Sequence, residues 1–469
     1  MYLVKVFTQK SMRHEIATSL MLTMTFSLGG CSGGFSGKRA AVGPQLEADE
    51  VFHPQPSKQS AVGSQLEADE VSHQNPGFQA TRAAILKVRS SINHSAIRTT
   101  RRVEGIERVS GPEGVLRTLV LTRRLAMDKC LLLFYAYVCL KPACSSNATE
   151  ISEEEYVVKY VDNCLSRLSG GKADPLYDEY VFSKVINELM GANVITPEVL
   201  GFSDQFVPNE FELGKHLPED TEISFMVDNV ESCRGSSARF IVEKRVGLSL
   251  FQLIPLIFAN SSSEFDYVDK TILAAKIFVK GILLLQKIHA IGIVHGDIHP
   301  GNIALADYKT DAVKKMGIVL AKDNIKSSFV LIDFGKARFV PEIDPSIEED
   351  IAGMTLQALS PWRLQRKPPS FRDDVFRMYE VLLNLLDQAK ALNEHYKRFG
   401  TSVTDADALA EAKLSPIWIS ESNLLGHITD EEYKQELLEK LIQLHILVTR
   451  DEDTPPYDAI LRIAKSLTQ

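Results

Sequence analysis

The chain has 469 residues, of which 45% are hydrophobic, and its formal net charge is −9 at pH 7. This length allows one to three domains, and the hydrophobic content is sufficient for a large core. The net negative charge argues against nucleic acid as the main partner.

The N-terminus has the composition of a secretory signal peptide. Three basic residues precede an apolar run over residues 16–28, and Gly29-Gly30-Cys31 follows it. The run is short and rich in Thr and Ser for a membrane span. We therefore expect a secreted protein with residues 1–31 as its signal peptide.

The next two segments differ in composition from the rest. Residues 32–78 hold few large apolar side chains and a two-copy repeat, in which Ala41–Val51 recurs as Ala61–Val71. Two copies are too few for a solenoid, so a disordered spacer is expected. Residues 79–129 are basic, with interspersed apolar residues, and we expect a helical extension that contacts an anionic membrane surface through residues 78–126. A solvated helical face or a disordered arm explains the pattern equally well.

From about residue 80 the pattern becomes globular, and the main domain is expected at 130–469. The expected elements are a strand or short helix at 131–140, a polar loop at 145–155, a strand at 156–161, a helix at 175–190, a strand at 239–242, and mainly helices after 250. This order predicts an α+β fold with two lobes, a small sheet-plus-helix N-lobe at about 130–245 and a mostly helical C-lobe at about 246–469. A cleft should separate them.

Two motifs carry chemistry. His295-Gly296-Asp297-Ile298-His299-Pro300-Gly301-Asn302 follows an apolar helical stretch, and Asp333-Phe334-Gly335 follows a short apolar strand. Phosphoryl transfer needs a carboxylate that accepts the proton of the attacking hydroxyl, and oxygen ligands that hold Mg²⁺ against the phosphates. The sequence therefore predicts Asp297 as the base, Asn302 and Asp333 as Mg²⁺ ligands, and ATP as the nucleotide.

A lysine with an acidic partner should contact the nucleotide phosphates. Lys159 lies in the Val-Val-Lys-Tyr-Val strand, and the structural alternative is an outward lysine on an edge strand. Glu179, twenty residues later, is the first choice for its ion pair, and Glu188 is the second. Glu243, where a strand leads into Glu243–Gly247, is expected among the nucleotide-binding residues.

Lys159, Asp297, Asn302 and Asp333 together resemble the pattern of the eukaryotic protein-kinase superfamily, over about residues 150–469. Arg372-Asp-Asp-Val and the ending Pro455–Ile463 resemble its casein-kinase-type branch. With the signal peptide, the basic segment and the lack of a glycine loop, the chain resembles the secreted With-No-Gly-loop kinases of coccidian parasites such as Toxoplasma, relatives of the rhoptry kinases. The resemblance implies a Ser/Thr protein kinase, stored in a rhoptry or dense granule, that phosphorylates membrane-associated proteins of the parasitophorous vacuole.

The chain departs from the common kinase pattern in several places. No Gly-x-Gly-x-x-Gly loop precedes Lys159, and the nearest candidate, Gly111-Pro112-Glu113-Gly114, contains a proline that removes a backbone amide. Gly296 stands where many kinases have an arginine, so activity without activation-loop phosphorylation is expected. His299 replaces the usual catalytic-loop lysine and is expected near the γ-phosphate, with its charge left open.

The start of the helix after residue 370 offers two acidic residues with different expected roles. Asp374 is placed to accept hydrogen bonds from the catalytic-loop backbone, or to act as an ordinary N-terminal cap, for which Asp373 competes. Ser360-Pro361-Trp362 takes the place of the Ala-Pro-Glu that usually ends the activation segment.

Two other functions remain open. One is a pseudokinase that binds partners, which the missing loop favours. The other is a small-molecule phosphotransferase of the aminoglycoside or choline kinase type, whose catalytic loop resembles His295–Asn302. Arg372-Asp-Asp-Val and the C-terminal segment argue against the second alternative.

Overall fold

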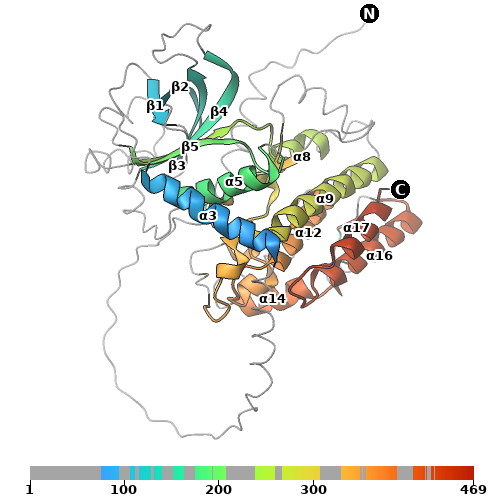
Figure 1. Cartoon of the computed structure of the whole chain (residues 1–469). Helices are drawn as coiled ribbons and strands as arrows, with labels where there is room; N and C mark the ends of the chain where they lie inside the picture. Colours follow the sequence, from blue (N-terminus) through green and yellow to red (C-terminus); the bar gives the residue numbers. More distant parts are fainter. Residues whose placement is uncertain are drawn as a thin grey trace, which may run out of the picture.

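The computed structural model describes residues 75–94, 106–110, 116–127, 131–139, 151–162, 175–192, 194–206, 238–258, 267–306, 329–348, 351, 355–387, 405–417, 419, 424–426 and 428–468. The expected signal peptide at 1–31, most of the spacer at 32–78 and Gly111–Gly114 lie outside these residues. The architecture is α+β, as expected, with a sheet at one end and most helices at the other (Figure 1).

A six-stranded antiparallel sheet has the order β1-β2-β3-β4-β6-β5. Its strands are β1 (Ile106–Ser110), β2 (Leu116–Met127), β3 (Leu131–Cys139), β4 (Ile151–Asp162), β5 (Val199–Phe206) and β6 (Ala238–Lys244). Lys159 of β4 pairs with Leu133 on one side and Ile241 on the other. β4 is therefore an interior strand, and the edge-strand alternative for Lys159 is wrong.

The expected helical extension at 79–129 is only partly helical. α3 (Pro76–His94) is a helix, whereas residues 106–110 and 116–127 form β1 and β2. The expected loop at 145–155 also differs, because residues 151–155 begin β4. In both places pairing with β3 or with a neighbouring strand satisfies backbone groups over long stretches, which local composition does not reveal. Residues 128–130, Asp-Lys-Cys, connect β2 to β3.

α5 (Pro175–Met190) packs against the sheet and forms as the sequence predicts. Proline at the first position of α5 suits a helix start, and the negative charge of Asp178 interacts favourably with the positive end of the helix dipole. The helix ends at Gly191, whose φ of 91° lies in the left-handed region. Leu176 and Tyr180, one turn apart, are buried, and so are Phe182 and Ile186 on another side of the helix.

α3 lies beside α5 (Figure 1) and is part of the same core. Ala84, Ile85 and Val88 are buried, and Lys87 pairs with Glu188 of α5 at 3.2 Å. The apolar side of α3 is thus used within the molecule. The apolar side of α3 is therefore not available for the membrane contact expected of 78–126, and the side chains of residues 95–126 lie outside the described part of the chain.

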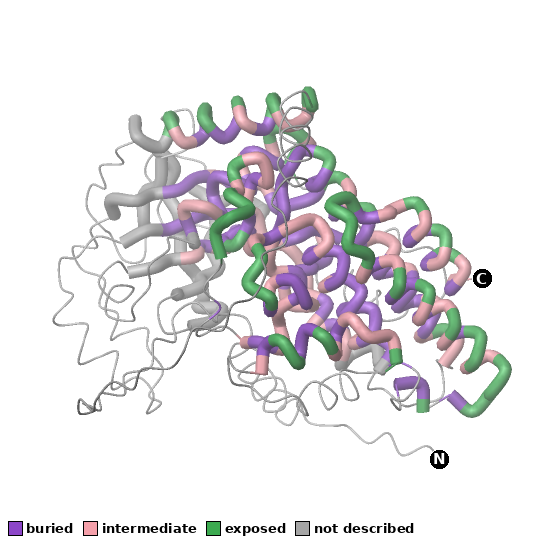
Figure 2. The backbone as a smooth tube through the Cα atoms, turned by 90° about the horizontal axis from the view of Figure 1, so that it is seen from below, coloured by how far each residue is buried: buried purple, intermediate pink, exposed green. Residues whose placement is uncertain are grey.

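The helical part is built around two central helices, α9 (Tyr267–Ala290) and α12 (Phe371–Asp387). The remaining helices are α8 (Leu250–Phe258), α11 (Pro361–Leu364), α14 (Ala406–Leu414), α16 (Glu431–Val448) and α17 (Tyr457–Ser466). Gly281 lets α9 approach α12, since a Cβ there would lie 2.5 Å from the sulfur of Met378. Buried segments run through the middle of this part, and exposed turns lie on its outside (Figure 2).

Two short antiparallel ladders bring the chemical motifs together. β7 (Ile293–Val294) pairs with β10 (Arg338–Phe339), and β8 (Ile303–Leu305) pairs with β9 (Phe329–Leu331). The turns η3 (Pro300–Asn302) and η4 (Phe334–Lys336) adjoin these ladders. Among the described residues, no helix is long and apolar enough to cross a membrane.

Candidate functional site

The loop that begins at His295 is anchored by Asp374, at the start of α12. The Asp374 carboxylate accepts hydrogen bonds from the backbone N–H groups of His295 at 2.7 Å and Gly296 at 2.9 Å. The expected bonds from Asp374 to the loop backbone are therefore confirmed. Asp373 instead accepts from the backbone N–H of Ser370 at 2.6 Å and from the hydroxyl of Ser360. The two neighbouring carboxylates thus have separate structural tasks.

Asp297 and Asn302 belong to one hydrogen-bonded loop. The side-chain Nδ2 of Asn302 donates to the backbone oxygen of Asp297 at 3.0 Å, and Asn302 is buried. The backbone oxygen of Asn302 accepts from the N–H of Ile332 at 3.0 Å, which places Asn302 beside the residue that precedes Asp333. His295 Nε2 lies 3.1 Å from the backbone oxygen of Ile332. Both motifs therefore meet at one place.

Asp333 adopts an unusual backbone conformation. Its φ of 65° and ψ of 70° lie in the left-handed region, which is uncommon for residues other than glycine and is found more often for Asp and Asn. Its side chain makes no capping hydrogen bond to η4, which follows directly. The strained conformation is therefore not explained by the folding of that turn.

Lys159 pairs with carboxylates from two other elements. It forms an ion pair with Glu179 of α5, as expected, and its Nζ lies 3.2 Å from Oε2 of Glu243 on β6. Glu188, the second choice, pairs with Lys87 instead, because it lies at the far end of α5. The buried side chain of Glu243 is thus the second counter-ion of Lys159, a contact that sequence reasoning missed.

The cluster of Lys159, Glu179, Glu243 and Asp333 contains more acidic than basic groups. Burial lowers the pKa of Lys159, but Glu179, Glu243 and Asp333 more than reverse this, so the net shift is upward. Burial raises the pKa of Glu179 well above its ordinary value, and the charges of Glu243 and Asp333 add to the rise. One ammonium therefore faces three carboxylates, and a cation would relieve their repulsion.

Asn302 and Asp333 are suitable residues to hold Mg²⁺ here. Mg²⁺ prefers oxygen ligands, and it is commonly held by one or two carboxylates together with substrate phosphates. Since Nδ2 of Asn302 is used by Asp297, its amide oxygen is the atom left for a cation. No cluster of three or more His, Cys, Asp or Glu side chains arranged for a metal occurs in the described part of the chain. A site with two protein ligands needs no such cluster.

Asp297 lies beside a cation and an imidazole. Its Oδ2 is 2.9 Å from Nζ of Lys336 and 4.0 Å from Nε2 of His299. Burial raises the pKa of Asp297, but the Lys336 ammonium outweighs that effect and holds the pKa below its ordinary value. Burial lowers the pKa of His299, which makes the neutral imidazole its form near pH 7.

A small hollow of about 20 Å³, partly open to solvent, adjoins Asp297. Its lining includes Gly296, Asp297, Leu359, Ser360 and Arg363. It therefore lies between the loop that begins at His295 and the end of the segment that joins Asp333 to α12.

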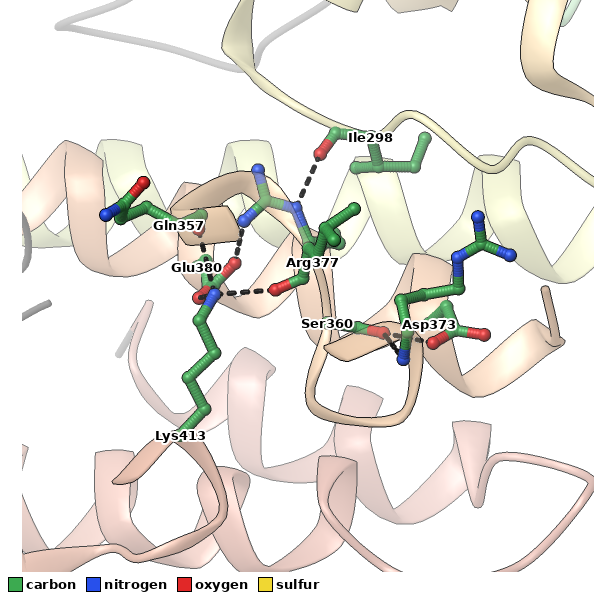
Figure 3. Close-up of polar contacts among 9 residues, drawn as sticks. Ile298, Gln357, Ser360, Asp373, Arg377, Glu380 and Lys413 are labelled. Carbon is green, nitrogen blue, oxygen red and sulfur yellow. Dashed lines mark hydrogen bonds and ion pairs between the residues drawn. The ribbon is translucent and has the colours of Figure 1, made fainter. Parts of the chain in front are cut away.

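That segment is held by a buried lysine that sequence reasoning also missed. The Nζ of Lys413, on α14, donates to the backbone oxygens of Gln357 at 2.9 Å and Leu359 at 2.7 Å, and pairs with Glu380 at 2.8 Å (Figure 3). Glu380 also pairs with Arg377, whose Nε donates to the backbone oxygen of Ile298 at 3.3 Å. The network therefore connects the segment that lines the hollow to the loop that begins at His295. In the sequence, the one sign of this network is a lysine that lies among apolar residues of a helix.

The sequence matches no protein-family model and no curated protein.

Proposed function

We propose that this chain is an ATP-dependent protein kinase, which transfers the γ-phosphoryl group of ATP to Ser or Thr hydroxyls of proteins. One observation carries the proposal. The buried Lys159–Glu179 ion pair lies next to Asp333, and Asp333 in turn adjoins the loop that contains Asp297 and Asn302. These are the residue types that phosphoryl transfer requires, and they come from four separate segments of the chain: β4, α5, the loop 295–302 and the residue before η4.

In this mechanism each residue has a defined task. Asp297 orients the acceptor hydroxyl and takes its proton, in its ionised form because its pKa lies below the ordinary value. Lys159, oriented by Glu179, binds phosphate oxygens of the nucleotide. Asn302 and Asp333 hold Mg²⁺, which when bound neutralises charge on the phosphate oxygens. His299 donates a hydrogen bond from Nε2 toward the phosphoryl group.

The arrangement of the two parts supports a two-lobed, kinase-like fold. The candidate phosphate-binding lysine is on an interior strand of an antiparallel sheet, its glutamate is on a helix packed against that sheet, and the base and metal ligands are in the helical part. The strands β2 and β3, which precede β4, pair antiparallel, and the three residues between them in the sequence, Asp-Lys-Cys, include no glycine. A glycine-rich phosphate loop is therefore not part of the proposed mechanism.

We further propose that the chain is a secreted kinase of the With-No-Gly-loop type, acting in a parasite vacuole. The support is the signal-like segment 1–31, the basic residues 79–129 and the glycine-free hairpin. Membrane-associated vacuolar proteins are the proposed substrates.

A protein acceptor is favoured over a small one by the segment before α12. Lys413 holds this segment, which lines the hollow beside Asp297, and so gives an extended acceptor an ordered surface. The pseudokinase alternative is favoured by the crowding of Lys159, because two glutamates compete with nucleotide phosphates for its ammonium.

The test is a transfer assay on the full secreted chain. Purified protein is incubated with radiolabelled ATP and Mg²⁺, with a generic protein acceptor in one arm and an amino-sugar panel in the other. We expect label on Ser and Thr of the protein acceptor, and none with Asp297→Asn, which preserves side-chain size. Transfer only to amino sugars would establish the small-molecule alternative. No transfer, with intact Mg·ATP binding, would favour the pseudokinase.

A further inference from the structure

We propose that Lys336 is a catalytic residue, which supplies the positive charge that the loop around Asp297 lacks. The inference rests on the proposed function. In the transfer, the acceptor oxygen bonds to the γ-phosphorus while the bond from that phosphorus to the bridging oxygen breaks, and its electron pair leaves on ADP. The hydroxyl proton goes to Asp297. Negative charge on the transferred oxygens must then be balanced by cations or hydrogen-bond donors.

His299 cannot supply this charge, although it lies close to Asp297. Its Nδ1 accepts a hydrogen bond from the backbone N–H of Gly301 at 3.0 Å, so the single ring proton lies on Nε2. The Nε2 atom is 4.0 Å from Oδ2 of Asp297, beyond hydrogen-bond distance, and it has no hydrogen-bond partner among the described residues. His299 therefore offers a donor without a charge.

Lys336 has a positive charge and lies beside Asp297. Its Nζ lies 2.9 Å from Oδ2 of Asp297, the residue assigned to take the hydroxyl proton. The side chain is 48% exposed, so it can move from the carboxylate to an arriving phosphoryl group. Arg377, another cation next to the loop, is held by Glu380 and by the backbone oxygen of Ile298. Lys336 is thus the better placed of the two.

Gly296 makes the position of Lys336 attainable. A Cβ at residue 296 would lie 2.6 Å from the backbone oxygen of Lys336, and a backbone atom cannot yield as a side-chain tip can. Gly296 also has a φ of +77°, which disfavours any other residue. The glycine that replaces the usual kinase arginine therefore lets the backbone of Lys336 approach the catalytic loop. The two departures from the kinase pattern, at 296 and 299, have a common explanation.

The experiment compares four variants of the full chain with the wild type. Lys336→Met removes the charge at similar length, and Lys336→Arg keeps it. The double variant Lys336→Met/His299→Lys moves a cation into the catalytic loop. Lys434→Met, on α16, is the control for loss of a lysine far from the site. Initial rates with a protein acceptor provide kcat, calorimetry provides the Kd for Mg·ATP, and thermal unfolding verifies the fold.

We expect Lys336→Met to lower kcat about 100-fold, as loss of a charge-stabilising donor does, with less than a threefold change in Kd for Mg·ATP. Lys336→Arg should stay within tenfold of wild type, and the double variant should recover at least tenfold over Lys336→Met. A folded Lys336→Met with unchanged or higher kcat would overturn the inference; a higher kcat would show that the ion pair restrains Asp297. Wild type without any transfer would overturn the proposed function as well, and so the two failures are distinguishable.

Discussion

Lys413 and Glu380, 33 residues apart, form a buried ion pair with Nζ and Oε1 separated by 2.8 Å. Because Lys413 also donates to two backbone oxygens of the segment before α12, this pair connects α14, α12 and the wall of the hollow. Loss of one partner of a buried pair leaves the other charge poorly compensated.

Lys413→Met should therefore lower the free energy of unfolding by about 3 kcal/mol. Arg377 remains paired with Glu380, which keeps the cost from being larger. Urea denaturation measures the change, with Lys434→Met as control, since Lys434 pairs with the exposed Glu431 and its replacement should cost less than about 1 kcal/mol. Equal costs for the two variants would show that the buried pair does not stabilise the fold.

Glu243→Gln should tighten Mg·ATP binding. The change removes a negative charge 3.2 Å from Lys159, so the ammonium is freer to bind phosphate and the site repels the nucleotide less. We expect the Kd to fall by roughly threefold to tenfold, which corresponds to about 1 kcal/mol. Calorimetry measures the affinity, and Glu188→Gln is the matched control because Glu188 pairs with the exposed Lys87. Weaker binding would instead mean that Glu243 is needed to position Lys159.

Ile85→Ala should destabilise the protein by about 2–4 kcal/mol, because Ile85 is fully buried between α3 and the core. The neighbouring Leu86 is 59% exposed, and Leu86→Ala should stay within about 0.5 kcal/mol of wild type. Chemical denaturation of both variants provides the comparison. If the two substitutions have equal effects, α3 does not dock as described.

His445 should make stability fall in mild acid. Its Nε2 donates to the backbone oxygen of Leu414 at 3.1 Å, and its buried Nδ1 has no hydrogen-bond partner among the described residues. A second proton would have no acceptor there. Burial accordingly holds the pKa of His445 below 6.5, despite opposing effects of Leu414 and Glu380.

The direction in which stability changes with pH follows from proton uptake by the unfolded chain. Above pH 6.5 both states are neutral at His445 and its contribution is complete; as the pH falls toward the folded-state pKa, only the unfolded chain gains a proton. Stability should therefore decline by at most about 1.4 kcal/mol per pH unit from this residue. Urea midpoints between about pH 5 and pH 7.5 test it. His445→Gln should have a shallower decline, and parallel curves would exclude His445 as the cause.

The sequence by itself identified Asp297, Asn302, Asp333 and the Lys159–Glu179 pair as candidates, because the chemistry of phosphoryl transfer restricts residue types at short spacing. It also predicted α5 and the strand containing Lys159, where apolar periodicity is strong.

Only the tertiary structure decided that residues 106–127 join the sheet, that Glu243 pairs with Lys159, and that Lys336 and Lys413 approach carboxylates. The physical reason is shared: a strand pairing or a buried ion pair depends on groups brought together from distant parts of the chain. Local composition around Lys413 or Arg117 contains no information about which carboxylate or strand will arrive beside it.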